Sequence, residues 1–261
     1  MQQSSRFLTA EWRWLAMLNY EVSPSVLIPY LPRGTEPDTW QGRYFVSLVG
    51  FLFLDTRVLG LPIPFHRNFE ELNLRFYVRH HSAEGWRRGV VFIREVVPRQ
   101  AVAAVARVVY NENYVALPMR HRIDLKGQEL SENGGVEYAW RFRGEWNHLK
   151  VRTCGAPFYP AAGSEEEFIT EHYWGYAAQR DGGCVEYQVE HPQWRVWRAA
   201  QAQLECRVSE MYAPEFAEPL NHPPTSAFVA EGSPVIVRRG RRLQPTATRV
   251  SSNRSDSPAS G

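Results

Sequence analysis

A polar strand face carries the first group of side chains with chemical potential. Residues 70–79 read EELNLRFYVR, and the period of two of a β-strand separates an apolar face from a polar one. The polar face consists of Glu71, Asn73, Arg75, Tyr77 and Arg79. Glutamates supply general acid–base catalysis and arginines hold anions, so this face predicts a ligand pocket. A solvated outer face is the alternative interpretation.

Neighbouring segments add further polar side chains. These are His66, Arg67, Asn68, Glu70, Arg94 and Glu95. The last two belong to GVVFIREVV, residues 89–97, which we expect to form the next strand. If the two strands pair, Arg75 meets Glu95 and a carboxylate–guanidinium cluster points into a cavity. Such charges are tolerated inside a protein only when they are paired and hydrogen-bonded.

The second polar group is YNENYVALPMRH, residues 110–121, which follows the apolar run AVAAVARVV. We predict a helix near residues 101–113. Helical spacing then aligns Arg107, Asn111 and Tyr114 on one face, with Tyr110 beside them. The pattern favours pocket lining. The alternative is a surface helix whose single arginine keeps its charged end in water.

Together the two groups suggest an enzyme that transfers protons on a small organic acid or carbonyl compound. The candidate catalytic residues are Glu70, Glu71, Glu112 and Arg120. Burial raises the pKa of a glutamate and suits it to act as general acid or base, whereas Arg120, helped by Arg75, would hold an anion. Tyr110 or Tyr114 would donate to a developing oxyanion. The other predicted cavity-lining residues are His66, Arg67, Asn73, Arg94, Arg107, Asn111 and Met119.

Cofactor and metal motifs are absent from the sequence. There is no phosphate-binding G-x-x-x-x-G-K-[ST] loop, no G-x-G-x-x-G, no H-E-x-x-H and no G-x-S-x-G. Adjacent His80 and His81 would point to opposite faces of a strand, and the three cysteines are scattered. We therefore expect no cofactor, metal or disulfide framework.

The charge and the apolar content of the sequence limit the kinds of partner that the protein can bind. A net charge of +2 is too small to predict nucleic-acid binding, although Arg238–Arg242 contains four arginines. We interpret that run as a solvated chain end, with a phosphate-binding patch as the alternative. No run approaches the ~20 apolar residues that span a bilayer, and MQQSSRF lacks the features of a signal peptide. These observations predict a cytoplasmic protein without a membrane partner.

The remaining pattern predicts a mainly β fold of the α+β class. Residues 12–22 alternate with period two, residues 44–54 are apolar on both faces, and further strand candidates follow at close intervals. With few helices, this favours a twisted antiparallel sheet or barrel. Residues 1–243 form one predicted domain. Residues 244–261 are rich in Ser, Thr and Pro and form a predicted disordered tail.

Several stretches resemble the YqjF-like family of uncharacterised bacterial proteins, domain of unknown function 2071. They are LNYEVSPSVLIPYLPRGTE, YFVSLVGFLFLDTRVLGLPIPFHRNFEELNLRFYVR, GVVFIREVVPR and YNENYVALPMRH. That family is distantly similar to acetoacetate decarboxylase. The resemblance implies a large antiparallel sheet curled into a cone-like barrel around a polar cavity, and usually a homo-oligomer.

The resemblance also marks a departure at the catalytic group. The decarboxylase carries Pro-Lys-Lys, in which one lysine forms an imine with the substrate and the neighbouring cation lowers its pKa. The matching residues here are Pro118, Met119 and Arg120, and the chain's two lysines, Lys126 and Lys150, lie elsewhere. Imine-dependent decarboxylation is therefore not expected. A non-catalytic protein that binds or senses a small molecule is the alternative to an enzyme, and an interaction module with a vestigial pocket is a third.

Overall fold

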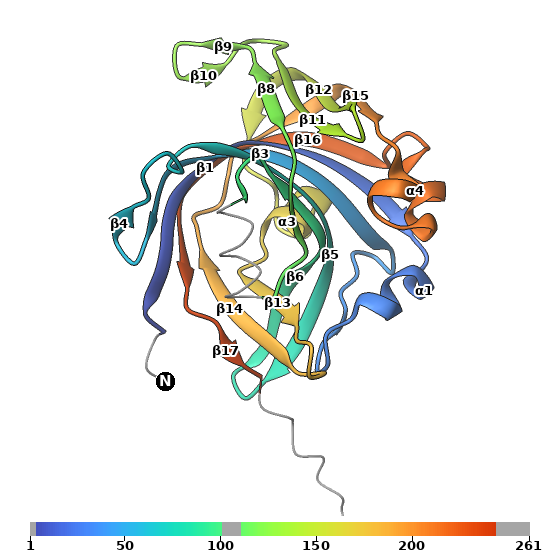
Figure 1. Ribbon diagram of the computed structural model, residues 1–261. Helices are drawn as coiled ribbons and strands as arrows, with labels where there is room; N and C mark the ends of the chain where they lie inside the picture. Colours follow the sequence, from blue (N-terminus) through green and yellow to red (C-terminus); the bar gives the residue numbers. More distant parts are fainter. Residues whose placement is uncertain (1–3, 101–110, 244–261) are drawn as a thin grey trace, which may run out of the picture.

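Seven strands close into a ring in the computed structural model, which describes residues 4–100 and 111–243 (Figure 1). Around the ring they are β1 (Arg6–Val22), β3 (Tyr44–Val58), β5 (Phe69–Ser82), β6 (Gly85–Val97), β13 (Trp174–Ala178), β14 (Cys184–Glu190) and β16 (Ser226–Arg238). The pairing of β14 with β16 closes it, because Val189 lies opposite Val237. The ring confirms the predicted mainly β fold with a curled sheet.

An extension of the same sheet folds back over the outside of the ring. From β16 it continues through β15 (Val196–Glu205), β12 (Glu145–Phe158), β11 (Gly135–Phe142) and β8 (Met119–Ile123). Tyr138 of β11 packs on β3 at Gly50, where an added Cβ would lie 2.6 Å from the tyrosine ring. The missing side chain of Gly50 therefore allows the two layers to approach.

Short elements complete the described chain. The strands are β2 (Glu36–Pro37), β4 (Leu61–Pro62), β7 (Tyr114–Ala116), β9 (Leu125–Lys126), β10 (Glu129–Leu130) and β17 (Arg241–Arg242). The helices are α1 (Pro24–Leu27), α3 (Glu165–Thr170), α4 (Val208–Met211) and α5 (Ala217–Leu220), with 3₁₀ turns η1 (Ile28–Tyr30) and η2 (Pro214–Phe216). Most pairings are antiparallel, but β6 pairs in parallel with β7 and β13, so the sheet is mixed. No helix in the described ranges is long and apolar enough to cross a membrane.

The central strands are buried on both faces, as the apolar run at residues 44–54 predicts. On β3, Val46, Leu48 and Leu52 belong to the core between the ring and the extension. Phe45, Val49, Phe51 and Phe53 of the same strand belong to a second core inside the ring. The strand period of two thus supplies each layer with its own apolar side chains.

The arginine run at residues 238–242 takes part in the sheet. Arg238 at the end of β16 is buried and pairs with Glu190, while Arg241 and Arg242 pair with Glu186 and Asp181. These ion pairs connect β16 and β17 to β14 and its turn. Three of the four arginines in the run are therefore ion-paired within the sheet, whereas Arg239 is exposed. Of the predicted helix near residues 101–113, residues 101–110 lie outside the described residues, as does the predicted tail. Residues 111–113 are not helical and Tyr114 begins β7, so the predicted helical alignment of Asn111 with Tyr114 is wrong. The single-domain assignment stays a prediction.

Candidate functional site

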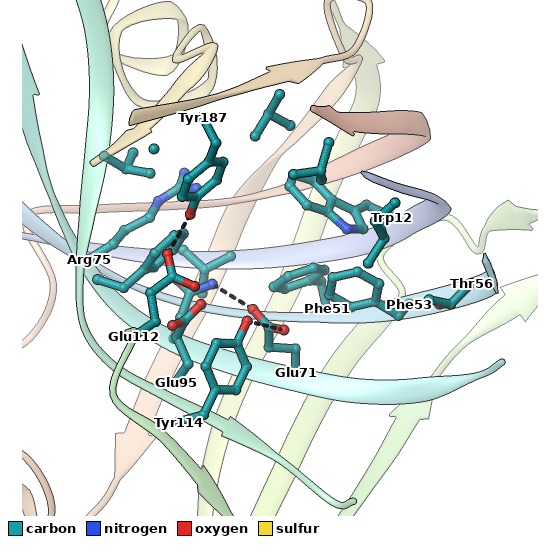
Figure 2. Close-up of a pocket in the computed structure, with 18 of the residues that line it drawn as sticks. Trp12, Phe51, Phe53, Thr56, Glu71, Arg75, Glu95, Glu112, Tyr114 and Tyr187 are labelled. Carbon is teal, nitrogen blue, oxygen red and sulfur yellow. Dashed lines mark hydrogen bonds between the residues drawn. The ribbon is translucent and has the colours of Figure 1, made fainter. Parts of the chain in front are cut away.

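A cavity of about 200 Å³ lies inside the ring. Its walls are mainly apolar and aromatic, and Trp12, Phe51, Phe53 and Phe69 contribute rings from three neighbouring strands (Figure 2). Polar side chains converge on one part of this wall. They are Glu71, Asn73, Arg75, Glu95, Glu112, Tyr114 and Tyr187. A mostly apolar hollow with a few convergent polar groups is the usual form of a small-molecule site.

Three carboxyl groups form the centre of the polar region. Glu71 on β5 is 3% exposed and Glu95 on β6 is 1% exposed, while Glu112, which precedes β7, is half-buried. Cross-strand pairing brings them together, because Asn73 lies opposite Glu95, and Glu95 lies beside Tyr114. The backbone N–H of Glu95 also donates to the carbonyl of Asn113, at 3.1 Å. The segment that contains Glu112 is thereby fixed against β6.

Hydroxyl and amide donors hold the carboxyl groups in place. Tyr114 Oη donates to Glu71 Oε2 and Asn73 Nδ2 donates to Glu71 Oε1, both at 3.3 Å. Tyr187 Oη donates to Glu112 Oε1 at 2.6 Å, and Figure 2 shows these contacts as dashed lines. Gly175 on β13 makes room for Tyr187, since an added Cβ would lie 2.2 Å from the Cζ of its ring. The cluster is therefore supported by tyrosines from two sides.

The environment favours protonated carboxyl groups. Burial raises the pKa of Glu71 to about 8, and the nearby carboxylate of Glu112 adds to the rise. Burial also raises the pKa of Glu112 to about 7 against the hydrogen bond from Tyr187. The pKa of Glu95 is raised well above its usual range by burial and by both other glutamates. No salt bridge within the described ranges neutralises any of the three. Near neutral pH the cluster therefore contains both acid and base forms.

Several buried polar atoms in the cavity wall lack hydrogen-bond partners among the described residues. They are Trp12 Nε1, Thr56 Oγ1, Asn73 Oδ1, Arg75 Nε, Glu95 Oε2 and both ring nitrogens of His172. Buried polar atoms in native proteins are normally satisfied by protein, water or ligand. The wall therefore presents both donors and acceptors to an occupant of the cavity.

Arg75 and His172 form a second polar region. Arg75 Nη2 donates to the carbonyl of Ile169 at 3.2 Å, and its guanidinium lies 5.7 Å from the centroid of the Tyr77 ring. His172 lines the same cavity, with its Nε2 3.8 Å from Asp38 Oδ2. Burial lowers the pKa of His172 to about 4, so the imidazole is neutral at physiological pH.

A β-bulge decides which side chains of β6 enter the cavity. Leu74 lies opposite Arg94 and Arg75 lies opposite Phe92, so Ile93 is an extra residue in β6. Strict alternation from Phe92 would send Arg94 inward and Glu95 outward. The bulge reverses this, and Glu95 lines the cavity while Arg94 lies on the opposite face and donates to the carbonyl of Met211.

The structure brings part of the predicted site together. The predicted residues on the cavity wall are His66, Glu71, Asn73, Arg75, Glu112 and Tyr114. Strand alternation placed Glu71, Asn73 and Arg75 on one face, and that face is the inner one. Arg75 and Glu95 share the cavity, but Glu95 lies opposite Asn73 and forms no ion pair with Arg75.

Other predicted residues lie away from the cavity. Glu70 lies on the opposite face of β5 from Glu71 and accepts a hydrogen bond from His121 at 2.8 Å, which lowers its pKa. This is contrary to the expected rise. Arg67 is exposed in a loop and pairs with Asp55, while Asn111 donates to the carbonyl of Ala178 at 2.9 Å.

Met119 and Arg120 also lie outside the cavity, because β8 pairs with β11 in the extension rather than with the ring. Met119 packs against the outer core, and exposed Arg120 lies 4.2 Å from the centroid of the Trp146 ring. Arg107 and Tyr110 lie outside the described residues.

Sequence reasoning did not select several cavity residues as site residues. They are Trp12, Phe51, Phe53, Thr56, His172 and Tyr187. The aromatic residues read as ordinary core in strand patterns. Tyr187 and His172 come from segments about 100 residues downstream of β5, and nothing in the local pattern connects them to it.

Most of the chain matches one protein family. The family model for the uncharacterized conserved proteins DUF2071 matches residues 9–234. The chain belongs to this family. A curated relative, the uncharacterized protein YqjF of Bacillus subtilis, is 26% identical over 204 residues, which cover 76% of this chain and 77% of YqjF.

Solved structures share the fold at low sequence identity. Acetoacetate decarboxylase from Legionella pneumophila is 12% identical with a TM-score of 0.64, over 91% of this chain and 87% of that one. The enduracididine biosynthesis enzyme MppR, solved in complex with pyruvate, is 13% identical with a TM-score of 0.65, over 94% and 92%. An acetoacetate decarboxylase-like enzyme from Sphingomonas wittichii has a TM-score of 0.63 at 13% identity, over 92% and 94%. At this identity the likeness establishes the fold of the DUF2071 chain and not its activity.

Proposed function

We propose that this protein is an enzyme that transfers protons on a small carbonyl compound bound inside the ring. The observation that carries the proposal is the convergence of Glu71, Glu95 and Glu112 in a mainly apolar cavity without a paired cation among the described residues. Buried carboxyl groups without a compensating charge, such as Glu71 and Glu95, reduce stability, so their presence beside a cavity supports a functional role.

General acid–base catalysis fits the protonation of the cluster. With the pKa of Glu112 at about 7 and that of Glu71 at about 8, a protonated and an ionised carboxyl group coexist near neutral pH. The carboxylic acid donates its proton to the carbonyl oxygen of the substrate, and the carboxylate removes a proton from the adjacent carbon. The product is the enol, with no change in oxidation state. Two groups with separated pKa values in one site suit such an exchange.

Covalent imine chemistry is not supported by the positions of the lysines. Lys126 lies on β9 and Lys150 on β12, where Lys150 is 3.9 Å from Glu205, and neither lines the cavity. The sequence-based expectation of a reaction without a Schiff-base lysine therefore becomes part of this proposal. The pyruvate complex of MppR supports a carbonyl compound as the ligand class, since the two chains share a fold.

The cavity wall limits the ligand. The rings of Trp12, Phe51 and Phe53 accommodate an apolar or conjugated body, and Arg75 offers a site for a carboxylate if the ligand carries one. A dianionic ligand would be repelled by the carboxyl cluster. We therefore propose neutral or singly charged carbonyl compounds as the class to screen.

Proton exchange in heavy water tests the proposal directly. A panel of small ketones and oxo acids is incubated with the protein, and loss of the proton signal next to the carbonyl is followed by NMR. We expect exchange with at least one compound and a decrease of roughly 100-fold in Glu71→Gln and Glu112→Gln. Glu70→Gln is the matched control, because Glu70 is next to Glu71 in sequence and faces the other way.

The outcomes separate enzyme from binding protein. Thermal stabilisation by a compound without proton exchange would favour the non-catalytic alternative. Exchange that is unchanged in both glutamine variants would remove the carboxyl cluster from the mechanism and refute the proposal.

A further inference from the structure

The hairpin between β3 and β5 presents an unusual apolar surface. We call residues 57–67 the apolar loop. Leu59, Leu61 and Phe65 are 67%, 71% and 90% exposed, the three highest values among the large apolar side chains of the described chain. Isolated surface leucines are ordinary, but three such side chains within seven residues form a concentrated patch.

The backbone of the apolar loop adds a second, independent observation. Leu59 and Phe65 have φ values of +51° and +63°. Left-handed backbone favours Gly, Asn and Asp, and a bulky residue there is unfavourable. Leu59 is the first of two residues in the tight turn between Val58 and Leu61, where Asn or Asp before Gly60 would fit better. Both unfavourable features, exposure and backbone strain, therefore occur together in the same two residues.

Arginines surround the base of the apolar loop. Leu59 N–H donates to the carbonyl of Phe7, which places Arg6 beside the turn. Within residues 4–10 and 55–67 the charged side chains are Arg6, Arg57 and Arg67 against Asp55. Only Arg67 has a salt bridge, to Asp55, among the described residues. The result is an apolar tip with a cationic collar.

The apolar loop also borders the cavity. Val58, Ile63 and His66 line the cavity and are themselves partly exposed, so this segment forms part of the cavity's opening. In Figure 1 the hairpin that contains β4 projects from the side of the ring, away from α1. An object in contact with the tip would therefore lie next to the route into the site.

We propose that the apolar loop inserts into the interfacial region of an anionic lipid bilayer and holds the cavity opening at the membrane surface. Exposed leucine and phenylalanine side chains bury their apolar area among the lipid headgroups, and the arginine collar meets anionic phosphates. A second copy of this chain fits less well, because three side chains on one hairpin offer far less than the ~800 Å² per partner of a stable dimer. Such surface association needs no membrane-spanning segment, and it departs from the sequence-based prediction of a protein without a membrane partner.

Vesicle sedimentation tests this inference independently of any activity. The full chain is mixed with vesicles of phosphatidylcholine alone and of phosphatidylcholine with phosphatidylglycerol. We expect binding to the anionic vesicles that weakens as salt rises, and weaker binding to the neutral ones. The triple variant Leu59→Ser, Leu61→Ser, Phe65→Ser is expected to lower partitioning by at least about tenfold, because each lost apolar side chain removes buried area.

Two single variants distinguish the contribution of the apolar loop to vesicle binding from that of any exposed apolar side chain, and measure the contribution of the arginines. Ile28→Ser removes a side chain that is 62% exposed in η1, next to α1 and away from the hairpin, and should leave binding unchanged. Arg57→Ser should weaken binding to anionic vesicles roughly fivefold. The melting temperature of each variant shows that it is folded.

Three results would overturn the inference. The first is the absence of binding to anionic vesicles at low salt, and the second is binding that the triple variant retains in full. The third is self-association that rises with protein concentration in light scattering and disappears in the triple variant, in a protein that does not bind vesicles. That third result would assign the tip to a second copy of the chain.

Discussion

Glu71 and Glu186 are buried to the same extent, each with 3% of its surface exposed, yet their surroundings are opposite. Glu186 on β14 accepts from Arg87 at 3.0 Å and from Arg241 at 2.7 Å. Glu71 on β5 has only the neutral donors Asn73 and Tyr114, and two other glutamates nearby. Equal burial thus serves two purposes: Glu186 connects strands through its ion pairs, and Glu71 retains a proton at neutral pH.

The comparison shows why burial alone does not identify a site. The Arg87–Glu186–Arg241 group neutralises a charge that the fold has buried, so it is explained by structure. The Glu71–Glu95–Glu112 group has no such compensation within the described residues and faces a cavity. A buried carboxyl group without a cation, next to empty space, is the more informative observation.

The largest expected change in stability comes from removing Glu186, the glutamate that is paired with arginines. Glu186→Ala leaves Arg87, which is 11% exposed, and Arg241 side by side without their shared counter-charge. We expect a loss of about 3 kcal/mol in the free energy of unfolding, measured by urea denaturation. Glu84→Ala is the control, because Glu84 also pairs with Arg87 but is 60% exposed and should change stability by less than about 1 kcal/mol. Equal losses in the two variants would contradict the distinction.

Glu71→Gln, unlike Glu186→Ala, should increase the free energy of unfolding at high pH. The pKa of Glu71 is about 8 in the folded chain against its ordinary 4.5, so between these pH values the folded state holds one proton more than the unfolded state. Stability therefore falls as pH rises, by about 1.4 kcal/mol per pH unit for one such group. The glutamine variant does not titrate there.

Unfolding measured from pH 6 to pH 8 checks this expectation. The slope should be smaller in Glu71→Gln than in the wild type, and the variant should be the more stable protein at pH 8. Glu70→Gln should keep the wild-type slope, because the pKa of Glu70 is lowered by His121. A wild-type slope in Glu71→Gln would show that Glu71 is already ionised at neutral pH.

The sequence predicts the inner face of β5 because strand alternation is a local property. Glu71, Asn73 and Arg75 follow from a period of two with an apolar opposite face. Residue types and spacing likewise predict the doubly buried strand at residues 44–54, and the family resemblance supplies the curled sheet. The strand face and the doubly buried strand depend on neighbouring residues alone, whereas the curled sheet is expected from the resemblance to a family.

The rest of the site depends on tertiary pairing. The bulge at Ile93 reverses Arg94 and Glu95 without a glycine or proline to mark it. Met119 and Arg120 belong to the predicted pocket segment, residues 110–121, but β8 joins β11 and carries them to the extension. Tyr187 reaches Glu112 only because β13 and β14 close the ring.

Gly175→Ala tests how β13 and β14, the strands that close the ring, hold Tyr187 at the cavity. The new Cβ would lie 2.2 Å from Tyr187 Cζ, in a position with backbone neighbours on β6 and β14. We expect a loss of about 1–3 kcal/mol in stability from overpacking, together with slower proton exchange. Gly183→Ala is the control, since its Cβ meets only the exposed side chain of Arg242, which can move aside. A fully stable Gly175→Ala protein with normal exchange would mean that the ring of Tyr187 has no fixed role.

The smallest expected effect isolates a single hydrogen bond in the carboxyl cluster. Tyr187→Phe keeps the ring and removes the hydroxyl that donates to Glu112 at 2.6 Å. Because this bond favours the ionised form, its loss should raise the pKa of Glu112 above about 7, by up to about one unit. Carboxyl ¹³C chemical shifts followed through a pH titration measure the change, and Tyr176→Phe, whose hydroxyl donates to the carbonyl of Arg87, serves as the control. A pKa of Glu112 that stays the same or falls in Tyr187→Phe would mean that Tyr187 does not set the acidity of the cluster, and the contrast with Glu186 would then rest on burial and charge alone.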